Sequence, residues 1–367
     1  MRVTRLQLHN YRNYTRADIA PCPGITVFHG DNAQGKTALL EAVYLCCIGR
    51  AHRTKHDKEL IRWGEQQARV QLDVLRQDGS HEIDILLSST ARKRVKVNAA
   101  QLSRSGELMG HVNGVLFSPE DLALVKDGPG ARRRFIDMEL SQIRPSYYYA
   151  LQRYHRALTQ RGALLREAGI KPALLSSIDD WDEQLAIAGA EIIAQRRLFL
   201  GKLDQVAGAI HRDISGGREQ LKLHYEQSLR SDETDNGLVE AFRMALLAAR
   251  EVDLRRQTTT IGPHRDDLGI VLNGVDARAY GSQGQQRTCA LSLKLSELHV
   301  MHEVSGEWPV LMLDDVMSEL DPSRRRQLFS MLRDVQTLVT CTDTSDLGGA
   351  RVGMMVHVHD GVATTEE

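Results

Sequence analysis

The sequence predicts a mixed α/β fold in which two parts of a sheet-containing core are separated by a helical insertion. An apolar run at residues 25–28 leads through a glycine-rich loop into an apolar helical segment. Near the other end, four apolar residues at 310–313 are followed by two acids. Between about residues 141 and 256, apolar residues recur at helical spacing. We therefore expect a first core half at 1–135, a helical arm at 136–256 and a second core half at 257–367.

Composition indicates an ordinary globular protein. With 367 residues, of which 42% are hydrophobic, the chain can bury one large core with an elaboration, or two domains. The formal net charge is −1, so any surface for nucleic acid must be a local patch. Five cysteines without a C-x-x-C pair favour neither disulfides nor a zinc site. No secretory segment and no apolar run of about 18 residues is present, so we expect a cytoplasmic location without a membrane partner.

The segment from residue 30 to residue 37 matches the phosphate-loop pattern G-x-x-x-x-G-K-T. It follows the apparent strand 25–28 and precedes the apparent helix 37–45, which is the context that this motif requires. Backbone N–H groups would surround a triphosphate, Lys36 would reach its β- and γ-phosphates, and the Thr37 hydroxyl would bind Mg²⁺. The alternative is an accidental glycine-rich turn. The expected nucleotide contacts are Gly30, Asp31, Asn32, Ala33, Gln34, Gly35, Lys36, Thr37 and Ala38.

The first strand is expected at residues 3–8, where polar and apolar residues alternate. We expect it to pair beside the strand that feeds the phosphate loop. That pairing would bring the segment 11–14 close to the nucleotide and makes Arg12 a further contact. A solvated turn is the alternative for this segment.

Three basic stretches, at residues 50–58, 92–96 and 132–134, are candidates for contacts with a polyanion such as DNA. Solvated surface is the alternative for each stretch. The arginines at 132–134 lie in the first turn of an expected helix, where cations oppose the helix dipole. They therefore either pair with carboxylates such as Asp137 or bind an anionic partner. The DNA candidates are Arg53, Lys55, Arg92, Arg94, Arg132 and Arg133.

Alternating segments at 70–76 and 81–87, joined by a turn, predict an antiparallel sheet beside the core, continued by a strand at 92–98. The arm is expected to be an antiparallel helical hairpin interrupted at Pro172, followed by a helix near 238–254. This is a compact arm rather than a long coiled coil. After it, His264, Asp266 and Asp267 suggest either metal ligands or a turn with local ion pairs, and the turn is preferred.

The apolar run 310–313 predicts a buried parallel strand that places Asp314 and Asp315 at the ligand-binding edge of the sheet. Asp314 is the expected Mg²⁺ ligand opposite Thr37, and Asp315 is expected to orient or deprotonate a water molecule. A strand ending in capping acids is the alternative. Upstream, residues 280–287 lead into a helix whose N-terminus could bind an anion, although an ordinary helix cap would use the same residues.

The phosphate loop, the S-x-G-Q segment at 282–285, the strand ending in acids and the S-E-L-D turn at 318–321 occur in the order found in ATP-binding-cassette ATPases. The insertion between the halves resembles heads of the structural-maintenance-of-chromosomes (SMC) type. The sequence more narrowly resembles the RecF family of bacterial recombination proteins over nearly its whole length. The segments that carry this resemblance are 8–14, 53–54, 117–122, 132–135, 262–267 and 283–287.

This resemblance implies an ABC-type ATPase head, with mixed sheets around a phosphate-loop core and an inserted compact α-helical arm. It implies ATP and Mg²⁺ as cofactors, with Lys36, Asp314 and Asp315 acting in catalysis. The signature of one chain would cap the nucleotide of another, so that ATP holds a homodimer together and hydrolysis releases it. The expected contacts from the second chain are Ser282, Gly284 and Gln285, with Asp321 at the dimer seam.

A weak DNA-dependent ATPase that acts as a switch is expected. Asp315 replaces the glutamate usual in transporters, no clear glutamine stands at 118–120, and the strand 337–342 ends without a switch histidine. Whether Asp315 or Glu319 positions the attacking water is left open.

The implied partners are double-stranded or gapped DNA and the proteins RecO and RecR, which would help to load RecA during recombinational repair, replication-fork maintenance and the SOS response. Two other function classes remain open: an ATPase subunit that energises a membrane transporter, and a phosphate-loop kinase acting on a small molecule.

Overall fold

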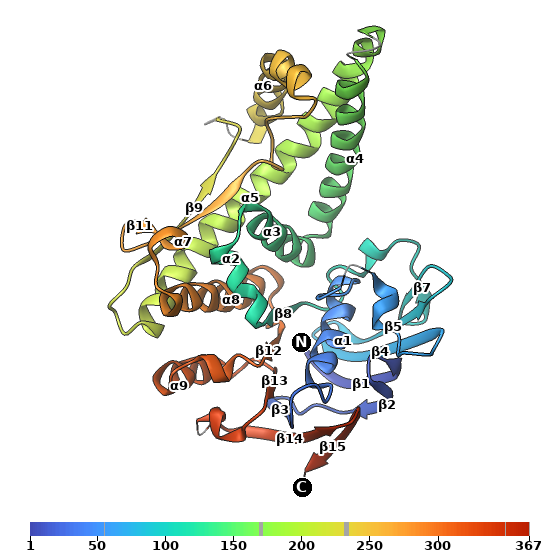
Figure 1. The fold of residues 1–367 in the computed structure, drawn as a ribbon, viewed down its shortest axis with the longest axis vertical. Helices are drawn as coiled ribbons and strands as arrows, with labels where there is room; N and C mark the ends of the chain where they lie inside the picture. The colour runs from blue at the N-terminus through green and yellow to red at the C-terminus, as the bar shows by residue number, and fades with distance from the viewer. Residues whose placement is uncertain (55, 169–171, 231–234, 349, 367) are drawn as a thin grey trace. The chain divides into compact units, whose positions relative to one another are not determined.

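The computed structural model describes residues 1–54, 56–168, 172–230, 235–348 and 350–366 (Figure 1). The chain forms two compact units. The first contains residues 1–122, 206–220 and 282–367, and the second contains residues 123–205 and 221–281. The division expected from the sequence, at residues 135 and 256, stays a prediction about separable domains. Among the described helices, none has both the length and the apolarity that crossing a membrane requires.

The first unit is centred on a six-stranded sheet of mostly parallel strands. Five neighbouring strands are parallel, and the antiparallel strand β15 completes one edge. Buried apolar side chains fill the central strands, as expected for a sheet covered on both faces. In sheet order the strands are β15 (Val362–Glu366), β14 (Val352–His359), β3 (Ile25–His29), β13 (Thr337–Cys341), β12 (Val310–Asp314) and β8 (Gly114–Phe117).

A second six-stranded sheet in this unit is antiparallel. Its strands alternate buried apolar and exposed polar side chains, so one face packs inward while the other meets solvent. In sheet order they are β2 (Tyr14–Ile19), β1 (Arg2–Tyr11), β4 (Gln67–Arg76), β5 (Gly79–Ser88), β6 (Arg94–Val97) and β7 (Ala100–Gln101). Helix α1 (Lys36–Ile48) contacts strands of both sheets, which explains why it is buried on nearly all sides.

The expected pairing of the first strand with the strand before the phosphate loop is wrong. β1 pairs with β2 and β4 in the antiparallel sheet, whereas β3 pairs with β13 and β14. The strand β2 was not anticipated, because its charged residues follow β1 after only a two-residue turn. Arg12 and Asn13 form that turn and still reach the phosphate loop, as described below.

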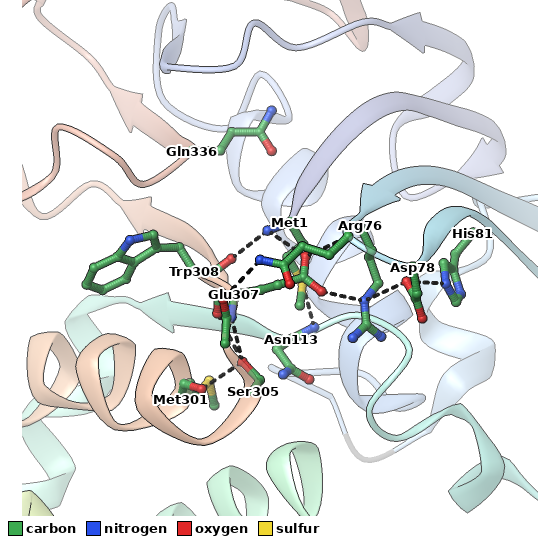
Figure 2. Close-up of polar contacts among 12 residues, drawn as sticks. Met1, Arg76, Asp78, His81, Asn113, Met301, Ser305, Glu307, Trp308 and Gln336 are labelled. Atoms are coloured by element: carbon green, nitrogen blue, oxygen red, sulfur yellow. Dashed lines mark hydrogen bonds and ion pairs between the residues drawn. The ribbon is translucent and has the colours of Figure 1, made fainter.

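The two sheets of the first unit are joined by a network around the first residue (Figure 2). The Met1 ammonium donates a hydrogen bond to the Trp308 carbonyl oxygen at 3.1 Å and pairs with Glu307 Oε2 at 3.1 Å. Arg76 Nε, from the end of β4, lies 3.3 Å from Glu307 Oε1. Burial of Glu307 opposes its ionisation, but the hydrogen bond and charge of the ammonium hold its pKa below the ordinary value. The start of β1 and the β4–β5 hairpin are thereby fixed to the segment that enters β12.

The second unit confirms the expected helical hairpin and adds a small sheet. Ion pairs join Arg153 to Glu191 and Arg161 to Asp182, so the paired positions run in opposite directions along α4 (Pro145–Glu167) and α5 (Ile178–Ile214), which lie side by side (Figure 1). A three-stranded antiparallel sheet also occurs in this unit, in the order β11 (Val275–Asp276), β10 (Asp267–Leu272) and β9 (Leu221–Glu226). The strand β9 was missed, since it lies inside the region that was expected to be helical.

The helices of the second unit, together with the sheet strands, have the following bounds: α2 (Ala123–Lys126), α3 (Pro129–Ile143), α4 (Pro145–Glu167), α5 (Ile178–Ile214, whose last turns belong to the first unit), α6 (Asp235–Arg256), α7 (Ala277–Tyr280), β9 (Leu221–Glu226), β10 (Asp267–Leu272) and β11 (Val275–Asp276). The first unit also contains the α-helices α8 (Gln283–Ser305) and α9 (Pro322–Met331).

Candidate functional site

The phosphate loop lies between the end of β3 and the start of α1, as the sequence predicts. Gly35 caps the helix with a φ of 115°, a conformation that favours glycine. Lys36 Nζ donates hydrogen bonds to the carbonyl oxygens of Gly30 at 2.6 Å and Asp31 at 2.7 Å. The side chain therefore folds back over the loop, and burial lowers its pKa. A cation held beside the N-terminus of a helix is suited to binding a phosphate chain.

A set of oxygen atoms gathers where β12, β13 and α1 meet. Asp314 Oδ1 accepts hydrogen bonds from Thr37 Oγ1 at 2.7 Å and from Thr340 Oγ1 at 2.8 Å. The contact with Thr37 joins residues from opposite ends of the sequence, 277 positions apart. Hydroxyl and carboxylate oxygens are the ligands that Mg²⁺ prefers. Thr37 and Asp314 therefore fit a Mg²⁺ ion bound together with a nucleotide, and the ion would neutralise phosphate charge there.

Asp315 has the features of a residue under functional constraint. Its φ is 52°, a left-handed value that is uncommon outside glycine, and its N–H donates to Thr340 Oγ1 at 2.9 Å. Burial, together with the neighbouring Asp314 carboxylate, raises the pKa of Asp315. A carboxylate with a raised pKa is a better proton acceptor than an ordinary aspartate, which suits a general base.

Arg53 and Glu120 also belong to this site, and sequence reasoning missed both roles. Arg53 Nη2 lies 3.1 Å from Asp314 Oδ2 and 3.0 Å from Glu120 Oε1. Arg53 was assigned to DNA because it stands in a basic stretch. Its actual partners are distant in sequence, and only the absence of a glutamine at residues 118–120 hinted that this segment had changed its role.

A cavity of about 940 Å³ opens beside the loop, a size suited to a nucleotide. Arg12 lines it and forms a two-contact ion pair with Glu41, with Nε and Nη2 each 2.9 Å from a carboxylate oxygen. Arg12 Nη1 also donates to the Glu59 carbonyl oxygen at 3.0 Å. Other expected contacts line the same cavity: Asn32, Ala33, Gly35, Lys36, Thr37, Ala38 and Asp315.

Two turns brace the phosphate loop from outside. The Gln34 carbonyl oxygen accepts hydrogen bonds from Asn13 Nδ2 at 2.6 Å and from Gly361 N at 3.3 Å. Gln34 Oε1 accepts another from Asp360 N at 2.7 Å. Gly30 packs so closely on β14 that a Cβ would lie 2.3 Å from the Val358 carbonyl oxygen. The β1–β2 turn and the β14–β15 turn therefore hold the loop in place.

The signature segment is exposed and lies outside the cavity lining. Ser282 caps α8, and its capping box with Gln285 has both contacts: Gln285 N to Ser282 Oγ at 3.3 Å and Ser282 N to Gln285 Oε1 at 2.9 Å. Gln285 Nε2 also donates to Glu219 Oε1 at 3.0 Å. A Cβ placed on Gly284 would meet no atom within 4 Å, so open space adjoins it. None of these signature residues is among those that line the cavity.

The seam residue Asp321 caps α9, with its Oδ1 accepting hydrogen bonds from Ser323 N at 3.0 Å and Arg324 N at 3.1 Å. Glu319 is the alternative to Asp315 as the residue that positions the attacking water. It lies in the short turn Met317–Glu319, but its side chain is outside the described part of the structure. The roles of both residues stay predictions.

The basic residues proposed for DNA differ in their surroundings. Arg132 is buried and pairs with Asp267 through two contacts of 2.7 Å, and Arg133 donates to the Asp266 carbonyl oxygen at 2.7 Å. For Arg132, the carboxylate alternative is correct, although its partner is not Asp137. Arg92 and Arg94 are exposed near and on β6, and Lys55 lies outside the described residues.

The segment 262–267 forms a structural turn in the second unit. His264 Nε2 lies 3.0 Å from the Thr259 carbonyl oxygen, and His264 Nδ1 lies 2.7 Å from Tyr154 Oη. Burial lowers the pKa of His264 to about 4, which keeps the ring neutral. The described residues contain no cluster of His, Cys, Asp and Glu that could hold a metal. The preferred sequence interpretation was a turn with local ion pairs: residues 262–265 do form a turn, but the ion pair of Asp267 is with Arg132, 135 residues away, and is not local.

Comparison with known proteins places this geometry in a family. The family model described as "RecF/RecN/SMC N terminal domain" matches residues 2–364. The DNA replication and repair protein RecF of Clostridium perfringens is 43% identical over 347 residues, covering 95% of this chain and 94% of the relative. RecF of Alkaliphilus oremlandii is 46% identical, covering 93% of each protein.

Solved structures agree with this match. The recombination mediator protein RecF with ATPrS, from the RecFOR pathway, aligns with a TM-score of 0.93 at 35% identity, covering 100% of this chain and 98% of that one. The Smc head domain of Pyrococcus furiosus aligns with a TM-score of 0.59 at 16% identity, covering 99% of this chain and 95% of that chain, and supports the fold alone. The structure therefore confirms an ABC-type head with an inserted arm, and the chain belongs to the RecF family of DNA replication and repair proteins.

Proposed function

We propose that this chain is an ATP-dependent DNA-binding protein of recombinational repair and replication, in which two copies close around two ATP molecules. The observation that carries the proposal is the separation of the two motifs within one chain. The phosphate loop lines a cavity, while Ser282 and Gly284 are exposed and do not line it. Because the signature of a chain does not line its own cavity, it has no nucleotide partner within that chain. The signature of a second chain could therefore bind the nucleotide in this cavity.

ATP would favour the closed pair by mass action, because the closed pair has more contacts with the nucleotide than two separate chains have. Mg²⁺ held by Thr37 and Asp314 would neutralise phosphate charge in this state. Asp315 would accept a proton from the attacking water, and its short side chain would keep hydrolysis slow. Slow hydrolysis suits a timed switch that holds the pair on DNA and then releases it.

Membership of the RecF family supports the DNA side of the proposal. A relative of known structure is described as a recombination mediator in the RecFOR pathway, which supports DNA, RecO and RecR as partners and RecA loading as the outcome. Double-stranded or gapped DNA is the proposed substrate. Of the predicted DNA contacts that the structure describes, Arg92 and Arg94 are exposed on and beside β6, whereas the exposed Arg53 pairs with Asp314 and Glu120.

The test compares Ser282→Arg with the wild type in ATP, in ADP and without nucleotide. Size-exclusion chromatography with light scattering should show an ATP-dependent wild-type dimer, and the bulky cation should abolish it while single-chain ATP binding stays unchanged. Ser176→Arg, at an exposed serine in the second unit, is the matched control. DNA binding is measured in parallel over a salt series. The proposal would be contradicted if Ser282→Arg still formed a dimer in the presence of ATP. It would also be contradicted if the DNA affinity of the wild type were the same with ATP, with ADP and without nucleotide.

A further inference from the structure

Trp63 is the least buried large hydrophobic residue in the part of the chain that the structure describes. Its side chain is 99% exposed, whereas Trp308 stacks on His302 with ring centroids 4.1 Å apart. Leaving an indole in water forfeits the stabilisation that its burial would give, since such side chains bury about 150–250 Å² when they are packed. We therefore expect an exposed tryptophan beside a cavity to contact a bound ligand.

The backbone around Trp63 is ordered rather than loose. Arg12 N donates to the Leu60 carbonyl oxygen at 2.8 Å, and Arg62 N donates to the Asn10 carbonyl oxygen at 2.8 Å. A turn follows, closed by a hydrogen bond from Glu65 N to the Arg62 carbonyl oxygen at 3.0 Å. Gly64, the third residue of this turn, has a φ of 87°, as a type II turn requires. The turn therefore presents the indole from a fixed backbone.

Trp63 lines the same cavity as the phosphate loop, together with Ile61 and Arg62. The cavity has a polar group of residues, Lys36, Thr37 and Thr340, which would take the phosphates. Arg12 connects the two groups, because it contacts Glu41 of α1 and the carbonyl oxygen of Glu59, two residues before Ile61. When the phosphates of a nucleotide lie on the loop, its base needs a binding surface of its own. The segment 61–63 offers an apolar side chain and an aromatic face for that contact.

We propose that Trp63 stacks on the base of the bound nucleotide and so contributes to nucleotide affinity in a single chain. This inference rests on the proposed function, since it assumes that the cavity binds ATP. An aromatic face attracts any base, because every base has a π-face of its own. Trp63 therefore strengthens the binding of nucleotides in general and does not by itself distinguish adenine from guanine.

Three ligands separate the parts of this claim: ATP, GTP and inorganic tripolyphosphate, each titrated calorimetrically into the full chain. Trp63→Ala should raise the dissociation constants of ATP and GTP by about tenfold, the effect of losing one stacked base, and should leave that of tripolyphosphate unchanged. Trp63→Phe should keep ATP binding within a few fold. Because the side chain is exposed, neither change should lower the melting temperature, and this is measured as a control.

Fluorescence gives a second readout. ATP should change the emission of the wild type, and the change should disappear in Trp63→Phe, while tripolyphosphate should cause little change in either protein. If Trp63→Ala binds ATP as tightly as the wild type, the stacking role is wrong, and a loss of DNA binding in that variant would assign Trp63 to DNA instead. A wild-type chain that binds neither ATP nor tripolyphosphate would overturn the proposed function itself.

Discussion

The phosphate loop and the signature segment belong to the same compact unit, yet they are built in opposite ways. The loop is braced by neighbours distant in sequence, including Asn13 and Asp360, and its Lys36 is only 7% exposed. Ser282 and Gly284 are exposed, and the segment is held mainly by contacts within its own helix, with a further hydrogen bond from Gln285 to Glu219. The phosphate loop is therefore organised before its ligand arrives, whereas the exposed signature segment is the part that the proposed function assigns to the nucleotide of a second chain. Changes in the first should alter nucleotide binding, and changes in the second should alter assembly.

The largest effect is expected for Lys36→Ala. Removing the only cation that the phosphate loop itself carries should raise the dissociation constant of ATP at least about 100-fold, since charge-assisted contacts to phosphate are lost. Calorimetry on the single chain measures this. Lys96→Ala, an exposed lysine on β6, is the control for a lost positive charge and should bind ATP normally. Near-normal ATP binding by Lys36→Ala would contradict the assignment of nucleotide binding to the phosphate loop.

A second large effect is expected for Asp315→Asn. Loss of the proton acceptor should slow hydrolysis by about 10²- to 10⁴-fold while ATP binding and dimer formation persist. Because the pKa of Asp315 is raised, its ionised form is lost as pH falls through that raised value. The wild-type kcat should therefore fall on the acid side at a higher pH than an ordinary aspartate, with a pKa of about 3.9, would give.

Asp315→Glu is the matched variant, since it keeps a carboxylate and should keep the acid limb of the pH profile. Hydrolysis by Asp315→Asn at the wild-type rate would transfer the role to another group, with Glu319 as the first candidate. Steady-state phosphate release from pH 5 to 9 distinguishes these outcomes.

The smallest effect is expected on the signature side, for Glu219→Ala. This change removes the acceptor for Gln285 Nε2 and the carboxylate 3.1 Å from His211 Nε2. The capping box remains, so the signature should lose only part of its order, and the ATP-dependent dimer should weaken by about fivefold, as expected for one net hydrogen bond. Sedimentation at several protein concentrations measures this. Glu226→Ala, at an exposed glutamate on β9, is the control, and a fall in single-chain ATP affinity would contradict the division of roles.

Local motifs were the most predictable part of the site. Thr37 and Asp314 were assigned from short patterns, and they meet at 2.7 Å although 277 residues separate them. Each pattern is a strand and loop whose chemistry is encoded by neighbours in the chain, and the order of the motifs then implied the sheet that joins them. The helical hairpin was predictable for the same reason, because its apolar spacing is regular over many residues.

What the sequence could not show were contacts chosen by tertiary packing. Arg53 stands in a basic stretch that resembles solvated surface, and only the folded chain brings it to Asp314 and Glu120. Arg132 opposes its helix dipole in the sequence, and the partner that resolves the conflict, Asp267, is 135 residues away. The short strands β2 and β9 depend on partners in their sheets more than on their own composition.

The bracing of Gln34 bears on how this loop can vary in evolution. The G-x-x-x-x-G-K-T pattern leaves residue 34 unspecified, but here its side chain accepts a hydrogen bond from Asp360 N, near the other end of the chain. Gly361 cannot easily change either, because a Cβ there would lie 2.4 Å from the Asn13 carbonyl oxygen. Whether a substitution at Gln34 is tolerated therefore depends on the residues of the β14–β15 turn. Residues 13, 34, 360 and 361 should co-vary among relatives as one epistatic group, even though only one of them lies in the motif.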